Sequence, residues 1–179
     1  TFVNEKESPT RTQGFWQTHT NFTSSVASSI VGGLKIGDVG LHKAGTGVGS
    51  SLSNNPVANG SELFGAYFSN IAMKSTGKGK NNQRSAIDKA RMQLLQQLVT
   101  AKLNCAAFGC ASSVQAMITA ADAAYAGTSI SAILASATAL DAYNNSGDTI
   151  IISPPLPAPG PATPQTSKLY ANLGFWDAP

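Results

Sequence analysis

Few side chains in this chain are of the types that carry out acid–base, nucleophilic or metal-assisted chemistry. Two histidines, His19 and His42, two cysteines and nine carboxylates are spread over 179 residues. Catalysis requires such groups to lie within reach of one another, and the sequence shows no cluster of them. We therefore expect no enzymatic activity, no catalytic residue and no cofactor. Two alternatives stay open: a metal or ligand site that combines His19 with Asp38 and His42, and a hydrolase with either histidine beside a carboxylate.

Cys105 and Cys110 are the two cysteines, and four residues separate them. A turn through Gly109 can bring their Cα atoms to the roughly 5 to 6 Å at which a disulfide forms, and an oxidising compartment favours the bond. We therefore predict a disulfide. The alternative is a pair of small buried apolar residues, while a zinc site would need more thiols than the chain supplies.

The composition describes one domain with little charge and a local basic segment. Only 12% of the residues are charged, about half the usual fraction, which suits an extracellular protein that packs against identical neighbours. Six of the twelve basic residues lie between positions 74 and 91. The loop 74–80 holds no aromatic residue for base stacking, so we expect no nucleic-acid partner. No apolar stretch approaches the roughly 18 to 20 residues of a membrane span.

Other sequence features favour the cell surface or the extracellular space. Thr1 in place of methionine fits a mature chain whose leader was removed, or one that begins at an arbitrary boundary. Three sequons, at Asn21, Asn59 and Asn144, would suit a glycosylated exterior, although a chain this rich in Asn, Ser and Thr carries one or two by chance. They predict N-glycans and leave glycan partners open.

Hydrophobic periodicity predicts a mainly α fold, a compact bundle of about four helices. The strongest pattern runs over 85–108, where Ser85-Ala-Ile-Asp88 has the form of a capping box and Gly109 provides a stop. Shorter patterns predict helices near 61–71, 113–126 and 129–143. The segment 20–59 fits no period cleanly, and its glycines and serines favour loops with short strands or one irregular helix, so we do not assign it.

Three stretches carry a family resemblance: Thr12-Gln-Gly-Phe-Trp-Gln-Thr-His19, Ala101-Lys-Leu-Asn104 and Ala139-Leu-Asp-Ala-Tyr-Asn-Asn145. In this order they resemble a widespread class of secreted microbial domains with the motifs Gly-Tyr/Phe-Trp-Lys-x-His, Ala-x-Leu-Asn and Leu-Asp-x-Tyr-Asn-Asn-Gly. The resemblance covers about residues 11–147. It implies an extracellular, mostly helical module of poorly defined biochemical function, without established catalytic residues. Gln17 replaces the lysine of the pattern and Ser146 precedes Gly147, so a site built on that lysine does not carry over. The matching residues are Gly14, Phe15, Trp16, His19, Asn104, Asp141, Tyr143, Asn144 and Asn145.

A structural role explains the first motif physically. Phe15 and Trp16 would anchor the incoming chain against the bundle. His19 would then hydrogen-bond either a helix end or the turn 143–145.

The chain divides into an extended N-terminal arm (1–13), a helical domain (14–147), a β-prone segment with a Pro-rich spacer (148–166) and an aromatic tail (167–179). The tail needs a docking groove, because its rings are costly to expose to water. It either folds back on its own bundle or reaches a neighbouring copy, as in polymers held by exchanged segments. The expected self-association residues are Ile150, Ile151, Ile152, Leu169, Tyr170, Leu173, Phe175 and Trp176.

Together these features predict a non-enzymatic extracellular structural protein. We expect a homo-oligomer or polymer, such as a pilus-like filament or a surface layer, in which terminal segments contact neighbouring copies. The alternative is a monomeric secreted adhesion module that binds glycans or proteins through exposed aromatic residues such as Trp16, Tyr67 or Trp176.

Overall fold

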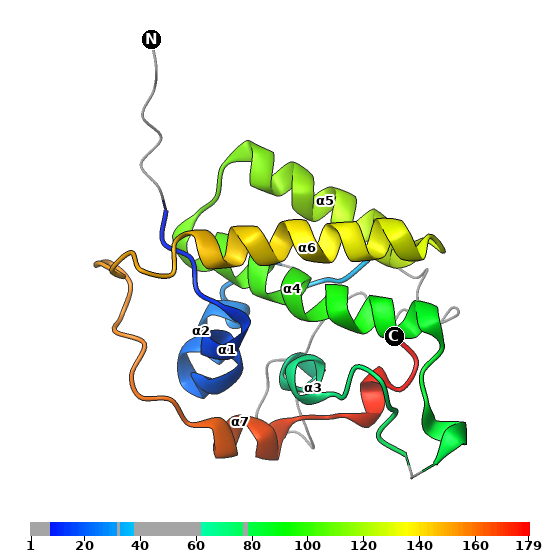
Figure 1. Cartoon of the computed structure of the whole chain (residues 1–179). Coiled ribbons are helices and arrows are strands. Elements are labelled where there is room, and N and C mark those ends of the chain that lie inside the picture. Colours follow the sequence, from blue (N-terminus) through cyan, green and yellow to red (C-terminus); the bar gives the residue numbers. More distant parts are fainter. Residues whose placement is uncertain (1–7, 32, 38–61, 77–78) are drawn as a thin grey trace.

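A computed structural model of the chain describes residues 8–31, 33–37, 62–76 and 79–179. The first seven residues of the predicted arm lie outside this range, as do Asp38, His42 and the sequon at Asn59. The chain is mainly helical, as predicted, and packs around a long central helix (Figure 1). In order, the described α-helices are α1 (Gln13–Thr18), α2 (Thr20–Ser28), α3 (Glu62–Phe68), α4 (Ala86–Phe108), α5 (Ser112–Ala126), α6 (Ile130–Ser146) and α7 (Pro164–Tyr170).

Helix α4 is the core of the molecule and contacts α1, α2, α3, α5 and α6. The predicted cap is present, because the Ser85 side chain accepts a hydrogen bond from the N–H of Asp88. Gly109 ends the helix with a φ of 75°, a conformation that favours glycine. The middle of α4 is buried on more than one face, as the side chains of Leu94, Leu95, Leu98 and Val99 show.

Helices α5 and α6 lie against α4 as a second layer (Figure 1). The Ser129 side chain caps α6 by accepting a hydrogen bond from the N–H of Ala132. The sequence leaves the segment from residue 20 onward unassigned, between loops with short strands and one irregular helix, and the structure shows helix α2 at its start. Thr20 and Thr23 are buried beside Phe22 and Val26, so the buried face mixes polar and apolar residues and a hydrophobic pattern does not reveal it.

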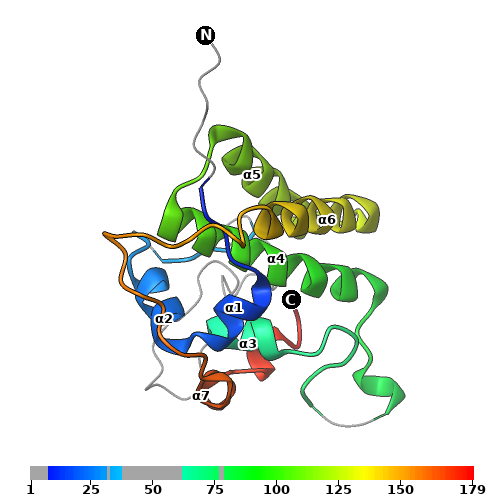
Figure 2. The same cartoon turned by 60° about the vertical axis from the view of Figure 1, so that its left-hand side comes forward.

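The chain after α6 differs from the segments expected from the sequence. Residues 148–153 form a turn and irregular chain, and the described residues form no strand, although isolated β-bridge positions occur, as between Met73 and Gln83. The Pro-rich stretch ends at Thr163, because Pro164 is the first residue of α7, a position where its missing N–H costs nothing. The connector passes α1 and α2 on its way to α7 (Figure 2). Helix α7 and the 3₁₀ turn η3 (Gly174–Trp176) contact α3, so the tail belongs to the same body.

Candidate functional site

The three motifs meet in one buried hydrogen-bond network, which we call the asparagine junction (Thr10, Arg11, Trp16, Asn104 and Asn144). The Asn104 Oδ1 atom accepts hydrogen bonds from the indole N–H of Trp16 at 3.0 Å and from the backbone N–H of Arg11 at 2.8 Å. Its Nδ2 atom donates to the Arg11 carbonyl at 2.9 Å and to Asn144 Oδ1 at 3.0 Å. All four hydrogen-bonding positions of this fully buried amide are therefore used.

The arm is anchored through the same junction. The Thr10 hydroxyl donates to the Asn144 carbonyl and accepts from the N–H of Gly147, both at 2.8 Å. The Arg11 guanidinium donates to the carbonyls of Gly147 at 3.3 Å and Ile150 at 2.7 Å. A Cβ atom at Gly147 would stand 2.6 Å from the Ser8 carbonyl oxygen, so only glycine allows this close approach. Thr10 and Arg11, which the sequence analysis placed in the arm, are therefore held against the helical body.

The remaining motif residues also make structural contacts. The His19 ring stacks on Phe15 with centroids 4.0 Å apart, and its Nδ1 atom lies 2.8 Å from the Phe15 carbonyl. His19 thus bonds the end of α1, which is the first of its two predicted roles. On α6, the Asn145 amide donates to the carbonyl and the side chain of exposed Asp141. The helix α1 that carries Phe15 and Trp16 includes Gly14 in its first turn.

The predicted disulfide is present between Cys105 and Cys110, with a Cα separation of 4.9 Å. It ties the end of α4 to the start of α5, beside the junction. The Tyr143 hydroxyl lies 3.7 Å from the Cys105 sulfur, and burial raises the pKa of this hydroxyl.

A second cluster holds the C-terminus, and we call it the tail latch (residues 163–177 with their receptor residues on α2, α3 and the 70–84 loop). Trp176 is fully buried, and its indole N–H donates to the Glu62 carbonyl at 2.7 Å. The Trp176 carbonyl accepts a hydrogen bond from the buried Arg84 guanidinium. A Cβ atom at Gly65 would stand 2.9 Å from the Asn172 carbonyl carbon. The missing side chain of Gly65 therefore lets the tail backbone lie directly on α3.

Polar contacts fix both ends of the tail latch. At its start, the Thr20 hydroxyl meets the hydroxyls of Thr163 and Ser167. At its end, the Asp177 carboxylate accepts hydrogen bonds from the N–H and the hydroxyl of Ser75, each at 2.6 Å. Burial alone would raise the pKa of Asp177, but these hydrogen bonds and the nearby Arg84 charge outweigh it and hold the pKa below its usual value.

The structure therefore shows the first of the two predicted fates of the tail, docking on its own bundle. Trp176 is buried, whereas Leu169 (79%) and Ile151 (81%) are exposed. Ile150 contributes its carbonyl to Arg11. The other proposed self-association residues are partly buried: Ile152, Tyr170, Leu173 and Phe175.

Two further sequence predictions need correction. Asn144 is fully buried and its Nδ2 atom donates to both oxygens of Gln97, at 3.0 and 2.9 Å, so the folded chain has no room for a glycan there. Asn21 is exposed on α2.

The aromatic residues suggested as an adhesive surface are buried instead: Trp16, Tyr67 and Trp176. Burial raises the pKa of the Tyr67 hydroxyl strongly, although its contact with Thr100 opposes the shift.

Most of the described acidic side chains form ion pairs or hydrogen bonds within the fold. Asp122 pairs with the Lys102 ammonium at 2.8 Å and accepts the N–H of Gly37, and Asp88 pairs with Arg91. Burial lowers the pKa of Lys102, and the charge of Asp122 opposes that shift. Within the described ranges, no three His, Cys, Asp or Glu side chains gather as metal ligands. None of the described helices is both long and apolar enough to cross a membrane.

Sequence reasoning singled out Trp16, Asn104 and Asn144 but missed Thr10, Arg11 and the receptor of the tail. A usable signal existed for Gly65, since a glycine inside a short aromatic helix indicates a close backbone approach.

No family model, curated protein or solved structure matches this chain.

Proposed function

We propose that this protein is a non-enzymatic structural protein of the cell surface or extracellular space. It is a subunit of a filament or surface layer in which terminal segments contact neighbouring copies. The observation that carries the proposal is the construction of the tail latch. It is a well-packed docking element at the end of a connector that contributes little to the fold.

The connector, residues 151–162, is mostly exposed and makes no backbone hydrogen bond with the described residues. Docking begins only at Thr163, whose N–H donates to the Thr18 carbonyl at 2.7 Å. The contacts that hold the tail would be identical if the tail came from another copy. Exchange of such a segment therefore creates an interface without any new surface.

Concentration decides between the two docking modes. A tethered tail experiences a roughly millimolar concentration of its own groove, so docking within one chain dominates in dilute solution. Exchange becomes competitive where copies are crowded, as they are at a cell surface. Exchange that does not close on itself produces an open polymer.

Two other features support the assignment. The Cys105–Cys110 disulfide suits an oxidising exterior. The most chemically capable side chain among the described residues, His19, is occupied in stacking on Phe15 and bonding the end of α1.

A disulfide across the latch tests the proposal. The hydroxyls of Thr20 and Ser167 touch, so cysteines in the variant Thr20→Cys/Ser167→Cys can lock the tail onto its own chain. We expect the wild type to form polymers as its concentration rises, and the oxidised variant to stay monomeric. Light scattering and negative-stain electron microscopy show whether each protein is monomeric or polymeric.

The same variant under mild reductant should polymerise again, and the wild type under that reductant controls for the native disulfide. Polymers of the oxidised variant would reject exchange of the tail. A wild type that stays monomeric at every concentration would reject the structural role.

A further inference from the structure

One of the three sequons is accessible in the described chain, and it is the one at Asn21. The Asn21 side chain is exposed on α2 and forms no hydrogen bond with the described residues. Asn144 is buried and its amide nitrogen donates to Gln97, while the sequon at Asn59 lies outside the described ranges. The Asn21 amide nitrogen is therefore open to a substituent in the folded chain.

Asn21 also lines a groove of about 320 Å³. One wall of the groove is α2, and the other is formed by residues 157–161 and Thr163, where the connector passes this helix (Figure 2). A volume of this size is at the lower end of the range of about 300 to 1,000 Å³ in which small organic molecules bind. The groove therefore adjoins the side chain that would carry a glycan.

The lining of the groove suits a neutral molecule with both apolar and polar surface. Pro157, Pro159 and Pro161 provide apolar C–H surface, and exposed Ser25 provides a hydroxyl that has no hydrogen-bond partner among the described residues. None of the described residues that line the groove is charged. A sugar ring has the same combination, with C–H groups on its faces and hydroxyls at its edge, whereas an anion or a metal ion would find no opposite charge.

The connector has little else to hold it at this point. Residues 151–162 make no backbone hydrogen bond with the described residues, and the prolines among them have no N–H to donate. A ring in the groove would contact α2 on one side and the connector on the other. It would therefore hold the connector in the position that it has when the tail latch is closed.

We propose that Asn21 carries an N-linked glycan whose first sugar ring lies in this groove. In the transfer, the Asn21 amide nitrogen bonds to the anomeric carbon of the sugar, and the bond from that carbon to the diphosphate of a glycosyl diphosphate donor breaks. The amide nitrogen loses one proton, which the departing diphosphate takes up. The inference rests on the proposed function for its location, because N-glycans are added to chains that leave the cell.

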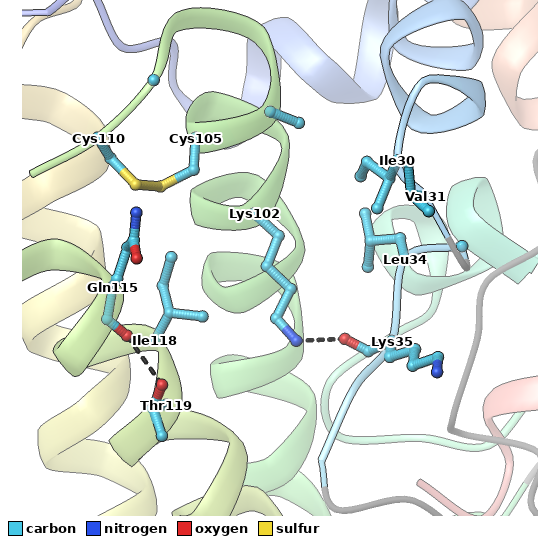
Figure 3. Close-up of a pocket in the computed structure, with 13 residues that line it drawn as sticks. Ile30, Val31, Leu34, Lys35, Lys102, Cys105, Cys110, Gln115, Ile118 and Thr119 are labelled. Atoms are coloured by element: carbon cyan, nitrogen blue, oxygen red, sulfur yellow. Dashed lines mark hydrogen bonds between the residues drawn. A yellow bond between two sulfur atoms is a disulfide. The ribbon is translucent and has the colours of Figure 1, made fainter. Parts of the chain in front are cut away.

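The sequon has to be recognised before α2 folds. The Thr23 hydroxyl, which completes the sequon, is buried in the folded chain and donates to the Trp16 carbonyl at 2.7 Å. A transferase therefore meets it only in the unfolded chain. Figure 3 shows the Cys105–Cys110 disulfide at one end of a separate pocket between α4, α5 and residues 30–35. This bond suits an oxidising compartment, in which a newly made chain can meet both reactions.

A glycan in this position would regulate exchange of the tail. With the connector held against α2, the tail stays close to its own docking site, and docking within one chain is favoured over docking on a neighbouring copy. Loss of the glycan would shift the balance toward exchange.

Peptide mass spectrometry of the protein isolated from the cells that make it tests the modification. Trypsin places the three sequons on separate peptides, residues 12–35, 44–74 and 103–168. We expect the peptide 12–35 to carry a glycan at Asn21, and the peptide 103–168, with buried Asn144, to be unmodified. An unmodified Asn21 overturns the proposal.

Moving the glycan tests its place in the groove. The double variant Asn21→Gln/Ser129→Asn removes the acceptor on α2 and creates the sequon Asn-Ile-Ser at 129–131, at the end of α6 opposite to the connector. Ser129 is exposed, and asparagine is also a favourable helix cap. Both proteins are secreted from the same glycosylating host, and their glycan occupancy is confirmed by mass.

Hydrogen exchange in residues 164–177 should be about tenfold slower with the glycan at Asn21 than with the relocated glycan, the equivalent of about 1.4 kcal/mol. In NMR spectra, nuclear Overhauser contacts should join the first sugar ring to Pro157, Pro159 or Pro161, and enzymatic removal of the glycan should abolish them. Equal exchange rates together with no contact to these prolines would place the ring outside the groove and overturn its assignment.

Polymer formation separates this inference from the proposed function. A protein that carries the glycan and stays monomeric at every concentration keeps the glycan assignment and rejects the structural role. A protein that forms polymers with an unmodified Asn21 keeps the structural role and rejects the glycan. Where both hold, removal of the glycan should lower the concentration needed for polymer formation, and an unchanged concentration would reject the regulation of exchange.

Discussion

The two tryptophans of this protein are both fully buried and both donate an indole hydrogen bond, yet they are held in different ways. Trp16 donates to the Asn104 side chain, inside a network of side chains from three parts of the sequence. Trp176 donates to the backbone carbonyl of Glu62, in a groove formed by the close approach of two backbones at Gly65. The asparagine junction therefore depends on specific side chains. The tail latch combines a close approach of two backbones with polar contacts at its two ends.

The two regions also differ in how they are attached. The junction joins α1, α4 and α6 within the core, so it can open only if the body unfolds. The tail latch joins the body through an exposed connector, so it can open while the body stays folded. A segment that can leave as a unit can be exchanged between copies, whereas the junction keeps each copy intact.

The largest effect is expected from Asn104→Leu. This change leaves the Trp16 indole N–H, the Arg11 N–H and the Asn144 side chain without their buried partners, at about 1 to 3 kcal/mol for each group. We expect the free energy of unfolding to fall by about 4 kcal/mol in a urea titration. Asn145→Leu is the matched control, because exposed Asn145 bonds only Asp141, and it should change stability by less than about 0.5 kcal/mol. If the two variants lost the same free energy of unfolding, the junction would have no special role in stability.

The second prediction concerns Trp176→Ala. Removing a buried tryptophan costs about 3 kcal/mol or more, and here the loss should appear in the tail and not in the core. Hydrogen-exchange mass spectrometry should show lost protection in residues 164–177 with α4 unchanged. Leu169→Ala, on the exposed side of α7, should leave both regions protected. Loss of protection in α4 would show that the tail and the body unfold together.

The elements that the sequence predicts well are those with local signals. Ser85, Gly109 and Ser129 mark the ends of α4 and α6, because caps and stops act within a few residues. The disulfide is predictable for the same reason, because its two cysteines are only five positions apart in the sequence. Helix α2 escaped prediction because its buried face contains Thr20 and Thr23.

The sites are less predictable because their partners are distant in sequence. The Arg11 N–H meets Asn104 across 93 residues, and Trp176 meets Glu62 across 114. The motif residues Trp16, Asn104 and Asn144 could be singled out, but not their mutual contact. The aromatic residues of the tail predict that it needs a docking surface. That surface combines backbone at Glu62 and Gly65 with polar side chains such as Arg84, and these leave no recognisable pattern in the sequence.

The smallest effect is a pH dependence that should separate the two regions. The pKa of Asp177 lies below its usual 3.8, because the hydrogen bonds from Ser75 and the charge of Arg84 outweigh the opposing effect of burial. Its contribution to docking is therefore complete above the unfolded-state pKa and is lost as the pH falls through the docked-state value. The junction contains no carboxylate. The two indole N–H signals in an NMR spectrum report on the two regions separately.

We expect the Trp176 signal to weaken as the pH falls below the usual carboxyl value and through the lowered pKa of docked Asp177, while the Trp16 signal stays in place until the body unfolds. In Asp177→Asn the acid-dependent loss should disappear, although docking is weaker at neutral pH because the carboxylate charge that Ser75 hydrogen-bonds and Arg84 attracts is gone. If both signals change together in the wild type, then the tail is an inseparable part of the core. In that case it could not pass between copies, and the exchange that the connector and the latch suggest would have to be abandoned.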